Sequence, residues 1–107
     1  MEAEEEAFRI LQENYSEEAK DQAYSLVLDQ IGKFIEKNRL RGTNFPKRAN
    51  SAMHILALGV AGKDLLSNPE KVERYLVEQL TRIRDGGFDI VEQILGEIVK
   101  EAKVMIK

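Results

Sequence analysis

Apolar residues recur every three or four positions along nearly all of this 107-residue chain, and no segment alternates apolar and polar residues as a β-strand does. This periodicity predicts an all-α fold. The widest apolar stripe lies near the C-terminus and comprises Phe88, Val91, Leu95, Ile98, Ala102 and Met105, flanked by Ile90, Ile94 and Val99. Bundle helices need an apolar face this broad, so we expect the stripe to be mainly core, with docking of another subunit as the alternative.

We expect one domain over residues 1–107, folded as a compact bundle of about five helices with a central apolar helix. The first two helices cover about 2–13 and 16–38, and either Asn14 or Ser16 caps the second. The third covers about 46–66, with Pro46 in its first turn. It is apolar on nearly every side from residue 52 to 61, which predicts the central position.

The last two helices are expected to form an antiparallel hairpin, because the turn between them is short. Ser67 and Glu70 have the spacing of a capping box, so Ser67 is predicted to cap the fourth helix. That helix is expected to end at Asp85, where Gly86 or Gly87 can take the left-handed conformation. The fifth helix then runs to the end of the chain.

The inventory of reactive side chains argues against an enzyme. Cysteine is absent and His54 is the only histidine, so we expect no disulfide, no metal site and no cofactor. Ser51 precedes His54 by one helical turn, but no third catalytic member is marked, and a histidine at the edge of a buried helix is the expected role. The acids at 17, 18 and 21 resemble half of a magnesium motif, whose second half is missing.

The helix around His54 is superficially similar to the phospho-acceptor helix of histidine phosphotransfer domains. That family needs a lysine and a glycine three and four residues after the histidine, where this chain has Ala57 and Leu58. We therefore reject this function. The chain also lacks an apolar run of about 20 residues, and its start is acidic rather than basic, so we expect a cytoplasmic protein that does not enter membranes.

Charge is distributed unevenly along the chain. The net charge is −3, yet residues 37–63 contain six basic residues and no acidic one. Lys47 and Arg48 fall in the first turn of a predicted helix, where the helix dipole disfavours cations by a few tenths of a kcal/mol unless an anion lies there too. Phe45 in the preceding loop could stack on a base. We predict a nucleic-acid backbone contact made by Lys37, Arg39, Arg41, Asn44, Lys47 and Arg48.

Two alternatives stay open for this basic block. Its members could act as dipole partners at the end of the second helix, or pair with the acidic first and second helices. The overall acidity also argues against a dedicated nucleic-acid binder, although not against one subunit of a larger nucleoprotein. A protein–protein interaction module or an immunity-type helical protein with no nucleic-acid role is therefore the alternative function.

In size, helical layout and possession of one basic face, the chain resembles the small helical subunits of CRISPR effector complexes. The resemblance rests on Lys37, Arg39, Arg41, Lys47 and Arg48. It implies a non-catalytic role in antiviral defence, with nucleic acid and other protein subunits as partners. Bacteriocin immunity proteins, which are helical bundles of similar length, provide a second analogy.

Overall fold

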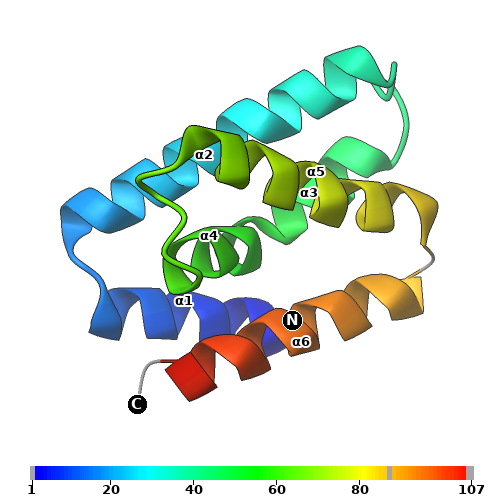
Figure 1. Ribbon diagram of the computed structural model, residues 1–107. Coiled ribbons are helices and arrows are strands. Elements are labelled where there is room, and N and C mark those ends of the chain that lie inside the picture. The colour runs from blue at the N-terminus through cyan, green and yellow to red at the C-terminus, as the bar shows by residue number, and fades with distance from the viewer. Residues whose placement is uncertain (1, 87, 106–107) are drawn as a thin grey trace.

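The computed structural model describes the backbone of residues 2–86 and 88–105, and the side chains of this part except those of Glu2, residues 88–91, Leu95 and Met105. Within it the chain forms helices and no strand, which confirms the all-α class (Figure 1). The helices are α1 (Glu2–Asn14), α2 (Glu17–Lys37), α3 (Phe45–Ser51), α4 (Met53–Gly62), α5 (Pro69–Asp85) and α6 (Phe88–Met105).

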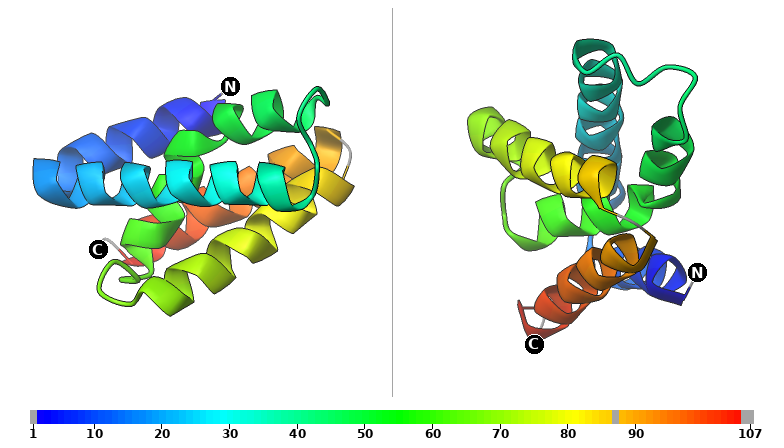
Figure 2. Two further views of the ribbon diagram at one scale, coloured as in Figure 1. Left: turned by 90° about the horizontal axis from the view of Figure 1, so that it is seen from above. Right: turned by 90° about the vertical axis from the view of Figure 1, so that its right-hand side faces the viewer.

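The helices pack in a compact arrangement in which α4 lies between α2 on one side and α1 and α6 on the other (Figure 1). Helix α5 runs beside α2 in the same direction. At one end, Gln22 of α2 donates to the Leu66 carbonyl just before α5, and at the other, Arg84 of α5 donates to Asn38 just after α2. The C-terminal ends of α2 and α5 therefore lie together, beside the loop to α3 (Figure 2).

Helix α2 starts where one of the two predicted caps places it. The Ser16 hydroxyl accepts a hydrogen bond from the Ala19 amide at 3.1 Å, whereas the Asn14 side chain donates to the Ile10 carbonyl. One turn into α2, the buried Lys20 ammonium donates to Gln12 of α1 at 2.5 Å. This contact fastens α1 to α2 and satisfies a charge that would otherwise be costly to bury.

The single helix predicted over 46–66 is wrong, because two helices, α3 and α4, meet at Ala52. The Ala52 amide bonds to the Ala49 carbonyl at 3.1 Å, a tighter turn than the α-helical one. The Ser51 hydroxyl donates to the Lys47 carbonyl at 2.9 Å, and such back-bonding by serine bends helices. No proline or glycine marks this break in the sequence.

Helix α4 also ends earlier than predicted. Asp64 adopts a φ of 56°, and the Leu65 amide bonds to the Val60 carbonyl at 3.1 Å. This is a Schellman closure, which a left-handed residue after the helix makes possible. Residues 55–61 of α4 are all buried.

The start of α5 differs from the prediction by one residue. Asn68, not Ser67, is the N-cap, and its side-chain oxygen accepts from the Lys71 amide at 3.2 Å. Pro69 can then occupy the first helical position, where its missing amide hydrogen is not needed. Gly86 ends α5 in an extended conformation rather than a left-handed one, and Gly87 lies outside the described residues.

The core is built from one face of each long helix. The buried face of α2 comprises Ala23, Val27, Ile31 and Phe34. That of α5 comprises Val72, Leu76, Leu80 and Ile83. In α6 the buried members are Ile94, Ile98, Val99 and Ala102, while the side chains of Phe88, Ile90, Val91, Leu95 and Met105 lie outside the described part.

Helices α4 and α5 approach closely at Gly59. A Cβ atom added there would lie 2.1 Å from the Tyr75 hydroxyl oxygen, so the glycine is required for this contact. None of the described helices is both long enough and apolar enough to cross a membrane.

Candidate nucleic-acid interface

The basic block lies at the connection between α2 and α3, which begins with a Schellman closure of α2. Arg39 follows the C-cap with a φ of 54°, and the Leu40 amide bonds to the Ile35 carbonyl at 3.0 Å. Glycine is the usual residue at this left-handed position, and another L-residue costs about 1–2 kcal/mol. The closure directs the chain away from the axis of α2.

The rest of the connection is a hydrogen-bonded turn. The amide and the hydroxyl of Thr43 both donate to the Leu40 carbonyl, at 3.2 and 2.6 Å. Gly42, the third residue of this turn, has a φ of 80°, the value a type II turn needs there. The Thr43 hydroxyl oxygen then accepts from the Phe45 amide at 3.2 Å. Because the loop is bonded along its length, its side chains project from a defined backbone.

Phe45 does not take the role predicted for it. The side chain is only 1% exposed, and its ring stacks on Phe34 of α2 with ring centroids 5.2 Å apart. A buried ring cannot stack on a nucleic-acid base, so Phe45 instead anchors the end of the loop to α2. The surface therefore offers charge without an aromatic platform at this position.

Most of the predicted site residues lie on the surface of this connection. The exposed ones are Lys37, Arg39, Arg41, Asn44 and Lys47. Arg41 pairs with Glu36, but its side chain remains 84% exposed. Among the described residues, the other cations of this exposed set form no ion pair, and Asn44 makes no side-chain bond to the start of α3. Their charges thus face solvent.

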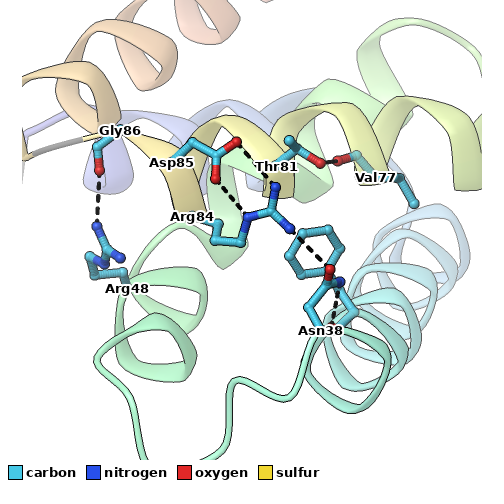
Figure 3. A network of polar contacts seen from close by, with 8 residues as sticks. Asn38, Arg48, Val77, Thr81, Arg84, Asp85 and Gly86 are labelled. Atoms are coloured by element: carbon cyan, nitrogen blue, oxygen red, sulfur yellow. Dashed lines mark hydrogen bonds and ion pairs between the residues drawn. The ribbon is translucent and has the colours of Figure 1, made fainter.

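Arg48 differs from the others because it bonds within the molecule. It is half-buried, and its Nη1 donates to the Gly86 carbonyl at the end of α5, at 3.2 Å (Figure 3). Its Nε atom is buried without a partner. The guanidinium thereby holds α3 against the C-terminal end of α5, where a cation is favourable.

Arg84 of α5 supports the same connection, a role the sequence did not indicate. Its Nη1 donates to the Asn38 side chain at 3.0 Å, and the guanidinium lies 5.6 Å from the centre of the Phe34 ring (Figure 3). Asp85 accepts from the same guanidinium at 2.7 Å and raises the pKa of Arg84. The loop is therefore held at its start by α5 as well as by α2.

The cluster around His54 lies elsewhere, between α1, α2 and α4. Nδ1 of His54 is 2.6 Å from the Tyr24 hydroxyl, the Phe8 ring packs 5.0 Å away, and burial lowers the pKa of His54. The His54 amide donates to Glu4 at 3.1 Å. Burial raises the pKa of Glu4 to about 7. Glu4 thus caps α4 from another helix, which the sequence gave no sign of.

Chemically, the exposed connection can contact phosphate groups through its basic side chains. In the described part of the chain, no group of three or more histidine or carboxylate side chains could hold a metal ion. Comparison with known proteins found no matching family model, no similar curated protein and no similar solved structure for this chain.

Proposed function

We propose that this chain is a non-catalytic subunit of a larger assembly, and that the connection between α2 and α3 contacts nucleic-acid backbone. The observation that carries the proposal is the exposed basic set on a hydrogen-bonded loop, namely Lys37, Arg39, Arg41 and Lys47. A molecule of net charge −3 concentrates these cations at one place. Such a patch attracts phosphates even when the whole domain is acidic.

The backbone of Arg39 supports the same proposal. Its left-handed conformation would suit glycine better, and strained residues of this kind are concentrated at functional sites. A glycine would close α2 equally well but would remove one exposed charge.

The buried Phe45 shapes the expected specificity. Proteins that bind single strands combine a basic groove with aromatic rings on which bases stack, and the described residues of this connection offer no exposed ring. Phosphate contacts carry no sequence information. We therefore expect binding that depends on salt and not on sequence, with duplexes bound at least as tightly as single strands.

The test is fluorescence anisotropy with labelled single- and double-stranded DNA and RNA at low and moderate salt. The variant replaces Lys37, Arg39, Arg41 and Lys47 with Ala. A control replaces the exposed Lys33, Lys71, Arg74 and Lys100, which changes the net charge equally. The proposal expects the first variant to lose most of its affinity and the control to keep most of it.

If neither the wild type nor the control binds any nucleic acid at low salt, the proposal is wrong. The basic set would then fit an acidic protein partner, as in an interaction module or an immunity-type protein. The resemblance to small CRISPR subunits belongs to the nucleic-acid-binding function, because it too depends on backbone contacts by the basic set.

A further inference from the structure

An open groove of about 1010 Å³ lies between the parallel helices α2 and α5. Two large apolar side chains of its lining are exposed, Leu28 of α2 at 51% and Val77 of α5 at 40%. Gly32 of α2 also lines it, and a Cβ atom added there would meet nothing within 4 Å beyond its chain neighbours and its own helix backbone. The groove therefore combines apolar surface with room for another chain.

The α5 side of the groove carries a symmetric pattern of residues. Glu73, Val77, Thr81 and Arg84 line it at helical spacing, and Glu70 lies one turn earlier on the same face of the helix. Figure 3 shows Val77, Thr81 and Arg84 on this helix. Residues 73 and 81 each lie four positions from Val77, one on either side. Residues 70 and 84 each lie seven positions from it. In an antiparallel pair of α5 helices centred on Val77, Glu70 of each copy would face Arg84 of the other.

Of the charged residues that α2 contributes to the groove, Asp29 pairs with Lys33 and Glu36 pairs with Arg41, so Lys37 is the one of them without an ion pair to a described residue. Lys37 lines the groove at the same end as Arg84, because Arg84 bonds to Asn38 there. The other end carries Glu70 and Glu73, and neither these carboxylates nor Lys37 form an ion pair with any described residue. A two-fold axis across the groove would bring the basic end of one copy onto the acidic end of the other.

We propose that the groove between α2 and α5 binds a second copy of this chain in an antiparallel, two-fold arrangement with Val77 at its centre. The α5 helix of each copy would pack against the groove of the other and cover the other copy's Leu28 and Val77. We expect a small interface, and therefore a weak and concentration-dependent dimer. Lys37 belongs to both this interface and the proposed nucleic-acid contact, but the dimer itself requires no nucleic acid.

Sedimentation equilibrium without nucleic acid tests it, over protein concentrations from about 5 µM to about 500 µM, which cover dissociation constants in the micromolar range. The weight-average mass should rise from 12.2 kDa toward twice that value. Val77→Glu and Leu28→Glu should each weaken the dimer by about tenfold or more, since they bury a charge. Both side chains are exposed, so the monomer should stay folded, which circular dichroism checks.

Val104→Glu is the matched control, because Val104 is 68% exposed on α6 and does not line the groove. It should leave the mass unchanged. A wild type that stays monomeric throughout, or a Val104→Glu variant that dissociates as readily as Val77→Glu, would overturn the proposal.

A charge exchange tests the orientation of the two copies. The proposed arrangement brings Lys37 of each copy near Glu73 of the other, which makes two equivalent contacts. Lys37→Glu alone and Glu73→Lys alone each place like charges at both of these contacts, so each variant should remain monomeric. An equimolar mixture restores opposite charges at both points and should dimerise, an effect that raising the salt concentration should weaken. A mixture that stays monomeric would rule out the antiparallel arrangement.

Discussion

Replacing Glu4 with Gln should change how the stability of this protein depends on pH. The Glu4 carboxylate accepts from the His54 amide at the start of α4, and its other oxygen is buried without a partner. Burial raises the pKa of Glu4 to about 7 from an ordinary value of 4.5. The folded chain therefore holds this proton more tightly than the unfolded chain does.

The sign and size follow from linkage. A raised folded-state pKa gives stability that is fully present below pH 4.5 and is lost as the pH rises through about 7. The two pKa values set an upper limit of about 3 kcal/mol, because one pKa unit corresponds to about 1.4 kcal/mol. Glu4 is only partly buried, so solvent screening reduces the expected loss to about 1–2 kcal/mol.

Glutamine resembles the protonated acid and does not titrate. Glu4→Gln should therefore match the wild type near pH 4.5 and exceed it by about 1–2 kcal/mol at pH 8. Urea unfolding at several pH values, followed by circular dichroism, measures this difference. Both proteins contain His54, whose amide bonds to Glu4, and Tyr24, whose pKa Glu4 influences, so the direct contributions of these two groups largely cancel. A difference between the two proteins that does not change with pH would refute the reasoning.

Three further predictions concern helix packing and the loop. Gly59→Ala should destabilise the protein by about 1–3 kcal/mol, because the added Cβ would meet Tyr75. Gly96→Ala, in open space on α6, should stabilise it by about 0.5–1 kcal/mol. Thermal unfolding of both variants, compared with the wild type, measures these two changes. Arg39→Gly should raise the free energy of unfolding by about 1 kcal/mol in urea titrations and should weaken nucleic-acid binding. A fall in stability would contradict the left-handed backbone conformation of residue 39. Arg48→Ala should cost about 1–3 kcal/mol in the same titrations, because its guanidinium bonds to a backbone carbonyl at the end of α5, and an unchanged stability would contradict that role.

The helical class and the buried faces of α2 and α5 were predictable from the sequence, since apolar periodicity reports which side of a helix is covered. The break at Ala52 was not, because it depends on a hydrogen bond from the Ser51 hydroxyl and on no helix-breaking residue. The N-cap of α5 was misplaced because Ser67 and Asn68 are both good caps and Pro69 suits either assignment.

The basic set was visible from charge alone, but the roles of individual residues were not. Sequence could not show that Phe45 turns inward onto Phe34, or that Arg48 bonds to Gly86 thirty-eight residues later. Both contacts join segments far apart in the chain. The same holds for Glu4, whose capping of α4 depends on how α1 packs.

The salt dependence of nucleic-acid affinity tests the central claim most directly. For a duplex, the slope of log affinity against log salt concentration is about −0.9 for each phosphate contacted. With Lys37, Arg39, Arg41 and Lys47 engaged, we predict a slope near −3 to −4 that falls by about one unit for each of these residues replaced by Ala. Either no binding at low salt, or a slope that the four replacements together leave unchanged, would contradict the account.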